Sequence, residues 1–276
     1  MRDPDSSAFR ELEKSGWESA ANEYDAGFGR LTTQSIGPML DALGVAAGHA
    51  LLDVACGPGY LAAEAARRGA AVTGLDFSAA MVELARQRNP GLRFQEGDAQ
   101  ALPYPDASFD AVTMNFGLLH LDQPERALAE AARVLKPGGR CGFTVWAPPP
   151  QTAAFRIILG AVEKHGRGDV PLPPGPPFFR YSDEATAKQA LRDAGLADVK
   201  VTIVPQTWRF DRPEQLFEAM LHGTVRSAAL LRAQTPQALE IVRAAIIAEA
   251  EKFATDNGIE LPMPSVLVTA AKPGSA

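Results

Sequence analysis

The segment 51–59 constrains the fold more than any other part of the chain. It reads Leu-Leu-Asp-Val-Ala-Cys-Gly-Pro-Gly, so an apolar run that contains Asp53 breaks into a turn with two glycines before a helical pattern begins. Glycine permits backbone conformations and close ligand approach that a Cβ would obstruct, and the start of the next helix offers unpaired N–H groups. The segment therefore predicts a strand that leads into a loop for a nucleotide-like cofactor.

Apolar runs typical of strands alternate with helical patterns from about residue 50 onward. Leu128, Ala131, Ala132 and Leu135, for example, follow the i, i+3, i+4, i+7 spacing of a helix that packs on a sheet. This order favours a parallel sheet with helices on its faces. The strands are expected at about 50–55, 70–76, 92–96, 109–114, 139–146, 198–204 and 265–271.

Two insertions interrupt the strand pattern after Trp146. Prolines cluster at 148–150 and 171–177, and a second stretch has helix starts such as Thr235-Pro236. Ser182 is expected to cap the helix between the insertions. The sequence thus divides into an N-terminal helical segment over the cofactor (1–35), a Rossmann-like core (36–147), a proline-rich lid insertion (148–181), a core helix and strand (182–210), a helical lid insertion (211–262) and a last strand with a tail (263–276).

Composition narrows the classes of partner. The net charge of −6 argues against broad electrostatic capture of nucleic acid or of an anionic membrane surface. No apolar run approaches the roughly 18 residues of a membrane helix, and the polar N-terminus does not match a secretory signal, so a cytoplasmic protein is expected. With two cysteines, neither a disulfide framework nor a cysteine-rich metal site is expected. A small-molecule partner fits best, and oligomeric state is not readable from the sequence.

The glycine loop alone fits two cofactors. Gly57-Pro-Gly59-Tyr-Leu-Ala62 matches the permissive form of the dinucleotide fingerprint. Asp76, at the end of the second expected strand, is placed to accept hydrogen bonds from ribose hydroxyls. Both NAD and S-adenosylmethionine carry such hydroxyls, so this loop leaves the choice between them open.

Segments further along the chain resemble a known family. They are Gly97-Asp98-Ala99 after the third strand, residues 108–120 across the fourth strand and its exit, and Leu135-Lys-Pro-Gly-Gly139. Together they resemble the small-molecule class I S-adenosylmethionine-dependent methyltransferases, above all the branch that contains quinone-biosynthesis C-methyltransferases. The ordered match covers residues 45–146. It implies a doubly wound, Rossmann-like, seven-stranded and mostly parallel α/β sheet with a helical lid inserted late in the chain.

The resemblance also assigns cofactor contacts for S-adenosyl-L-methionine. Asp53 and the loop at 57–59 would lie against the methionine part, Asp76 would hold the ribose, and Asp98 with Ala99 would receive the adenine. Asn115 would contact the methionine amino group. The full set implied for the cofactor is Tyr24, Gln34, Asp53, Ala55, Gly57, Pro58, Gly59, Asp76, Phe77, Met81, Gly97, Asp98, Ala99, Asn115 and Phe116.

Two positions depart from the family pattern. Ala55 stands where a glycine is common, and it is compatible with the loop if its φ angle is negative. Tyr60 stands where a third glycine is frequent, so its ring must point away from the methionine tail or form part of the wall around it.

Methyl transfer needs an acceptor held in line with the methyl group and, for a hydroxyl, amine or activated carbon, a base. His120 follows the fourth strand at the carboxyl edge of the sheet and is the candidate base; the alternative is a structural or pocket-lining histidine. The apolar insertions suggest a hydrophobic or aromatic acceptor. The candidate pocket residues are Trp146, Phe178, Phe179, Tyr181, Trp208 and His222.

Two other functions remain as alternatives. An NAD-linked oxidoreductase would explain Gly57, Gly59 and Asp76, but not the segments around Asp98 and Lys136. A non-catalytic S-adenosylmethionine-binding protein would retain the cofactor residues without turning over an acceptor.

Overall fold

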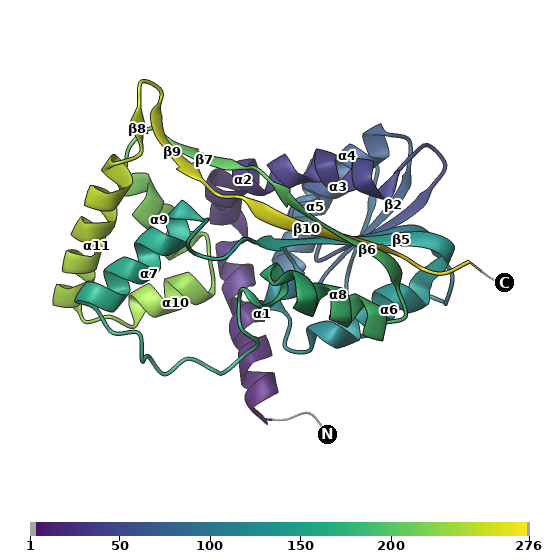
Figure 1. The fold of residues 1–276 in the computed structure, drawn as a ribbon, viewed down its shortest axis with the longest axis horizontal. Coiled ribbons are helices and arrows are strands. Elements are labelled where there is room, and N and C mark those ends of the chain that lie inside the picture. The colour runs from purple at the N-terminus through teal and green to yellow at the C-terminus, as the bar shows by residue number, and fades with distance from the viewer. Residues whose placement is uncertain (1–3, 275–276) are drawn as a thin grey trace.

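A seven-stranded sheet forms the centre of the computed structural model, which describes residues 4–274 (Figure 1). The strand order is β3-β2-β1-β4-β5-β10-β6, and only the pairings of β10 are antiparallel within this sheet. The predicted α/β fold class is thereby confirmed. The strands are β1 (Ala50–Val54), β2 (Ala71–Asp76), β3 (Arg93–Glu96), β4 (Phe109–Asn115), β5 (Leu135–Trp146), β6 (Ala197–Val204) and β10 (Ser265–Ala271).

The strand order reverses at β1, which pairs with β2 on one side and β4 on the other. In open α/β sheets, the loops at the carboxyl ends diverge at such a point and leave a crevice for a ligand. Asp53, Asp76 and Asn115 all lie at or next to the carboxyl ends of these three strands. The topology alone therefore gathers them at one edge.

Helices cover both faces of the sheet because side chains alternate along each strand. Leu51 packs in a core with α3 (Ile36–Leu43), α4 (Tyr60–Arg67) and α5 (Ala79–Arg88). Leu52, one residue on, packs in the opposite core with α6 (Pro124–Val134) and α8 (Glu184–Asp193). This second core continues into the lid, so the lid and the sheet share buried apolar surface.

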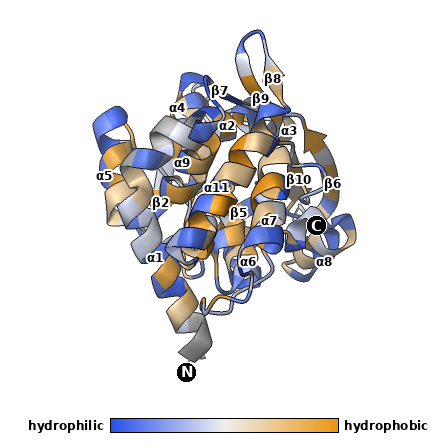
Figure 2. Cartoon of the chain, turned by 90° about the vertical axis from the view of Figure 1, so that its left-hand side faces the viewer, coloured by the Kyte–Doolittle hydropathy of each residue, from blue (hydrophilic) through white to orange (hydrophobic). Residues whose placement is uncertain are grey.

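The lid is a helical lobe beside the sheet, on the left in Figure 1 and facing the viewer in Figure 2. Between the lid and the core stands the long helix α1 (Pro4–Tyr24). Both hydrophilic and hydrophobic colours mark the lid helices in Figure 2, as expected when one face is buried. Across residues 4–274, no helix has the length and apolar character to cross a membrane. The lid helices are α7 (Ala153–His165), α9 (Glu214–His222), α10 (Arg226–Arg232) and α11 (Pro236–Glu251).

Part of the segment 211–262 is extended, whereas the sequence predicted helices throughout. β8 (Ala254–Thr255) and β9 (Gly258–Pro262) form a small antiparallel sheet with β7 (Thr207–Phe210). Ile259 and Leu261 are buried opposite Phe210 and Trp208. This period-two alternation, which follows a turn at 256–257, is the strand signal that the helical interpretation overlooked.

Capping residues define two of the helix starts. Thr235 caps α11 as predicted, because its side chain accepts a hydrogen bond from the N–H of Ala238. The prediction that Ser182 caps α8 is wrong by one residue. Asp183 caps this helix by accepting from the N–H of Thr186 at 2.8 Å, while the Ser182 hydroxyl donates to the carbonyl of Phe179. Aspartate and serine are about equally good N-caps, but the Ser182 hydroxyl is already bonded to Phe179, which leaves the capping position to Asp183.

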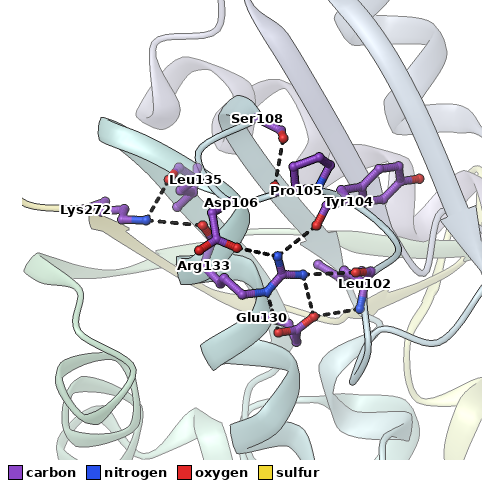
Figure 3. Close-up of polar contacts among 9 residues, drawn as sticks. All are labelled: Leu102, Tyr104, Pro105, Asp106, Ser108, Glu130, Arg133, Leu135 and Lys272. Carbon is purple, nitrogen blue, oxygen red and sulfur yellow. Dashed lines mark hydrogen bonds and ion pairs between the residues drawn. The ribbon is translucent and has the colours of Figure 1, made fainter.

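Arg133, near the end of α6, holds the connection between β3 and β4 in place (Figure 3). Its guanidinium forms two hydrogen bonds with Glu130, at 2.7 and 2.8 Å. The same group donates to the carbonyls of Leu102 and Tyr104 and to the carboxylate of Asp106. Glu130 in turn accepts from the N–H of Leu102. This planar, multidentate contact fixes a loop that follows Asp98, one of the candidate cofactor residues.

We expect Arg133→Lys to lower the free energy of unfolding by about 2 kcal/mol. Lysine keeps the charge but cannot reproduce the fork of N–H groups, so loop carbonyls lose their donors. Urea unfolding measures the change, with Arg126→Lys as the control, since Arg126 is exposed on the same helix and its side chain forms a hydrogen bond with Gln123. Equal stabilities of the two variants would contradict this role.

Candidate active site

A cavity of about 1100 Å³, open mouth included, lies at the carboxyl edge of the sheet, bounded by α1 and the lid. Part of its wall is polar and comes from the loops after β1, β2, β3 and β4, which contribute Gly57, Asp76, Asp98 and Asn115. The rest is largely aromatic and comes from the N-terminal segment, β5 and the lid, with Phe28, Trp146, Phe155 and Phe178. One continuous space therefore joins a polar region to an aromatic one.

Asp76 ties the glycine loop to the end of β2. One carboxylate oxygen accepts from the N–H of Gly57 at 2.8 Å, and the other accepts from the N–H of Ser78 at 3.0 Å. Burial raises the pKa of Asp76, and the backbone hydrogen bonds oppose that rise. Each carboxylate oxygen can accept more than one hydrogen bond, so Asp76 retains acceptor capacity toward the cavity that it lines. It can hold a pair of ligand hydroxyls there.

Asp53 is a buried carboxylate with one oxygen left without a partner in the described structure. It is 1 % exposed, and its Oδ1 accepts from the hydroxyl of Thr113 at 3.0 Å. Its Oδ2 makes no hydrogen bond with any described residue. Burial raises the pKa of Asp53 to about 7; the hydrogen bond from Thr113 opposes this rise, the charge of Asp76 adds to it, and the backbone N–H of Ala62 opposes it weakly. A cationic ligand group would satisfy this oxygen and restore the ionised form.

The space beside Asp53 is a smaller cavity of about 340 Å³ that shares wall residues with the large one. Ala55, Gly57 and Asn115 line both cavities, while Asp53, Pro58 and Tyr60 line the smaller one. The Tyr60 hydroxyl accepts from Arg88 at 2.6 Å, so the ring stands as part of the wall, one of the two placements that the sequence allowed. An ammonium group that reached this cavity would lie near the unpaired oxygen of Asp53.

Two non-glycine residues, Ala55 and Phe116, have left-handed backbone conformations at the carboxyl edge of the sheet. The φ angles are +52° for Ala55 and +58° for Phe116, so the expectation of a negative φ at Ala55 is wrong. This conformation costs an L-residue about 1–2 kcal/mol. The Cβ of Ala55 lies so close to Gly117 that a Cβ there would approach it to 2.5 Å. The bare backbone of Gly117 therefore makes room for the strained alanine.

The side chain of Asn115 connects the N-terminal segment to the sheet. Its Oδ1 accepts from the hydroxyls of Ser35 and Thr144, at 2.8 and 2.7 Å, and its Nδ2 donates to the carbonyl of Thr32. Thr144 also accepts from the N–H of Phe116 at 3.0 Å. The amide of Asn115 thus makes structural contacts, although the residue does line the cavity as expected from the sequence.

Asp98 lies at the far end of the polar region, near helix α1. One of its oxygens accepts from the N–H of Gln100, and the other accepts from the guanidinium of Arg10 at 2.7 Å. Gly97 donates its N–H to the carbonyl of Asp76, which holds the two loops together. The remaining candidates on this wall are Phe77, Met81 and Ala99, all of which line the cavity.

Several candidate residues lie outside both cavity walls. Gln34 forms two hydrogen bonds with the backbone of Thr207 in β7. Its side-chain NH₂ donates to the carbonyl at 2.9 Å, and its side-chain oxygen accepts from the N–H at 3.0 Å. Gly59 begins α4 at a φ of +82°, where a Cβ would meet Phe94 at 2.9 Å. These two residues shape the surroundings of the site and are not among its lining residues.

Four of the candidate pocket residues are likewise outside the cavity lining. The indole of Trp208 donates to the carbonyl of Gly27, and the Tyr181 hydroxyl donates to Glu125. His222 is half-exposed and next to Glu218. Phe179 packs against Phe155 and Phe178 from behind. The candidate pocket residues that the structure does bring to the cavity are Trp146 and Phe178. The candidate cofactor residues Tyr24 and Phe116 and the candidate base His120 also line it.

The sequence interpretation missed the side chains that α1 and α10 place at the cavity. Arg10 and Trp17 line it, and they precede the predicted Tyr24 at a spacing of seven residues that puts all three on one face of α1. This helical repeat was the available signal. Arg226 on α10 and Phe155 on α7 also line the cavity. Neither follows a recognisable motif, because the packing of the lid decides which of its residues face inward.

Solved structures share this architecture. YcgJ from Bacillus subtilis superposes with a TM-score of 0.58 at 21 % identity, covering 87 % of this chain and 99 % of YcgJ. A phosphoethanolamine N-methyltransferase from Haemonchus contortus, solved with S-adenosylhomocysteine, gives a TM-score of 0.58 at 17 % identity over 96 % of this chain and 60 % of that enzyme. At these identities the likeness defines the class of fold.

Sequence comparisons find similarity that is confined to the core of the chain. Residues 52–143 match the methyltransferase domain family model. Demethylmenaquinone methyltransferases from Renibacterium salmoninarum and Tropheryma whipplei are 47 % and 48 % identical over 102 and 124 residues. These alignments cover 37 % and 42 % of this chain, and the chain spans only 43 % and 51 % of the two relatives. Residues 52–143 are therefore similar to the methyltransferase domain, which confirms the family resemblance for this part of the chain.

We expect Asp53→Asn to flatten the pH dependence of stability between about pH 4 and pH 7. The folded pKa of about 7 exceeds the ordinary value of 3.8, so the folded state binds the extra proton in this window. In the ligand-free protein, the stabilisation contributed by protonated Asp53 should therefore decrease as the pH rises from about 4 to about 7. The total loss is about 1.4 kcal/mol for each unit by which the folded pKa exceeds the unfolded pKa.

Urea unfolding at pH 4.5 and pH 7.5 measures this effect, with the exposed Asp193→Asn as the control. Asp53→Asn should abolish most of the decrease in the free energy of unfolding between pH 4.5 and pH 7.5, whereas Asp193→Asn should show the same decrease as the wild type. An unchanged slope in Asp53→Asn would show that Asp53 is ionised throughout this range.

Proposed function

We propose that the chain is an S-adenosylmethionine-dependent methyltransferase that acts on a small aromatic acceptor under its lid. The observation that carries this proposal is the joining of two regions in one cavity. A polar region with three carboxylates and a glycine loop runs into a chamber of aromatic rings. The first suits a polar nucleoside cofactor, and the second suits an apolar ring system.

The residues present fit this cofactor. Asp76 retains acceptor capacity for ribose hydroxyls, and Asp98 with the backbone of Ala99 offers an acceptor and a donor to an adenine edge. The unpartnered buried oxygen of Asp53 fits the ammonium group of a methionine moiety, since it otherwise has no partner among the described residues. When bound, the cofactor supplies an electrophilic methyl group on a sulfonium.

The chamber wall supports an acceptor with an aromatic ring. Phe116 and Trp146 stack at 4.1 Å, and Phe155 contacts both Trp146 and Phe178 edge to face. Such surfaces favour offset or edge contacts with a further ring. Because the related proteins are named demethylmenaquinone methyltransferases, we infer a quinol-type or phenolic ring as the acceptor class. The relatives match only the core, so the lid of this chain determines the ring substituents that fit.

His120 is the proposed base. It lies in a short turn (Leu118–His120) after β4 and lines the cavity with Trp17, whose ring meets the imidazole edge to face at 4.8 Å. A histidine there can take the proton of an acceptor hydroxyl as that atom becomes nucleophilic. The lid and α1 shield the acceptor from water and hold it for in-line attack.

Transfer of a labelled methyl group to phenolic and quinol acceptors tests this proposal. We expect wild-type protein to label at least one acceptor, and Phe178→Leu to change the order of preference across the panel by about tenfold for the largest rings, because the mutation opens the chamber wall. Phe253→Leu is the control, since Phe253 belongs to the lid but does not line the cavity.

Two results would contradict the proposal in different ways. Binding of S-adenosylhomocysteine without label in any acceptor of a broad panel would favour the non-catalytic alternative. An identical order of preference in Phe178→Leu and wild type would remove Phe178 from the acceptor site.

A further inference from the structure

Glu13 is a fully buried carboxylate that joins α1 to the core and to the lid. It is 0 % exposed, and its two oxygens have different partners. Oε2 lies 3.0 Å from Nδ1 of His120, and Oε1 accepts from Nε of Arg226 at 2.7 Å. The three residues come from α1, from the turn after β4 and from the start of α10. The proposed base is therefore held by parts of the chain that are far apart in sequence.

Arg226 is itself fixed on every side. Its two terminal nitrogens donate to the carbonyls of Pro176 and Leu119, each at 2.9 Å. Its guanidinium lies over the rings of Phe9 and Phe178, at 4.4 and 5.4 Å from their centroids. These contacts hold the Arg226 guanidinium in place as the countercharge of Glu13. Burial acts to raise the pKa of Glu13, but His120 and Arg226 outweigh it and lower the pKa, so the carboxylate is ionised.

The contact with Glu13 determines which nitrogen of His120 carries the proton. An ionised carboxylate only accepts hydrogen bonds, so Nδ1 must carry the hydrogen. No hydrogen bond links Nε2 to another described residue, and the imidazole lines the cavity. In the neutral imidazole with its hydrogen on Nδ1, Nε2 is an acceptor nitrogen available to an acceptor hydroxyl.

We propose that Glu13 is a positioning residue that fixes the tautomer and orientation of His120, with Arg226 as its countercharge. The base is then complete only where α1 and α10 are both docked on the core. The proton that leaves the acceptor hydroxyl is held on Nε2, while Nδ1–H remains bonded to Glu13. This inference rests on the proposed function, because it gives His120 a role only if an acceptor is deprotonated.

Glu13→Gln makes a sharp test because the amide has one acceptor and one donor group. Arg226 has only donors, so it takes the amide oxygen, and the NH₂ group then faces Nδ1 of His120. Nδ1 must now accept, which moves the ring hydrogen to Nε2. We expect the tautomer to invert and the acceptor nitrogen in the cavity to disappear.

Nitrogen-15 NMR of the imidazole rings reads the tautomer directly, without cofactor or acceptor. The chain has four histidines, and His120→Asn assigns the relevant signals. We expect an Nδ1–H ring at position 120 in the wild type and an Nε2–H ring in Glu13→Gln. Glu18→Gln, an exposed site on the same helix, should leave the signals unchanged. An Nε2–H ring in the wild type, or the same tautomer in Glu13→Gln, would overturn the proposal.

Kinetics with a labelled acceptor separates positioning from folding. In Glu13→Gln, kcat should fall at least about tenfold, whereas the acceptor KM and the Kd of S-adenosylhomocysteine should change less than twofold. Unchanged kcat, or parallel losses of kcat and cofactor affinity, would overturn the proposal. Glu13→Asp is a second variant, which keeps the charge but moves the carboxylate away from His120. A wild-type tautomer population together with a wild-type kcat in Glu13→Asp would also overturn the proposal. If no acceptor is methylated, the proposed function fails. The NMR result still decides whether Glu13 determines the tautomer of His120.

Discussion

The hydrogen bonds of Asp76 to the backbone of Gly57 and Ser78 are the interaction on which the site depends. They connect the loops after two adjacent parallel strands, β1 and β2, at the point where the strand order reverses. Without a buried acceptor, these N–H groups would lose their partners, and the glycine loop would no longer be held beside β2. The same carboxylate lines the cavity, so the group that builds the loop is also the proposed acceptor for ligand hydroxyls.

The chain closes this site with elements from both ends of the sequence. Arg10 on α1 pairs with Asp98, and Glu13 pairs with Arg226 of the lid and with His120 of the core. The polar wall belongs to the matched methyltransferase domain, while much of the aromatic wall comes from the N-terminal segment and the lid. In the proposed function, these two walls separate cofactor recognition from acceptor recognition, as expected when different chemistries are built on one fold.

The core was predictable because its signals are local. Strand runs, the glycine turn and Asp76 each follow from residues close together in sequence. The seven strands of the main sheet lie where the runs predicted them, except that β5 begins at Leu135, which the helical spacing had assigned to the preceding helix. The lid was less predictable, since its inward side depends on tertiary packing. Trp208 and Tyr181 looked like pocket residues by their chemistry, yet each places its polar atom on a distant structural partner. Glu13 escaped notice because a lone glutamate in a polar helix carries no local sign of burial.

The strained backbone at Ala55 shows another limit of sequence reasoning. An alanine favours negative φ, and only the bare backbone of Gly117 across the loop makes the observed +52° possible. That compensation is a contact between loops that no local pattern reports. Strain of this kind at a loop that lines the cavity is consistent with a backbone shaped for a ligand.

Calorimetric titration with S-adenosylhomocysteine tests the central claim most directly, using wild-type protein freed of bound ligand, Asp76→Ala as the site variant and NAD as the competing cofactor. The account predicts that wild-type protein binds S-adenosylhomocysteine and not NAD, and that Asp76→Ala binds it at least about tenfold more weakly while remaining folded. Binding of NAD alone, or undiminished affinity in the folded variant, would contradict the account.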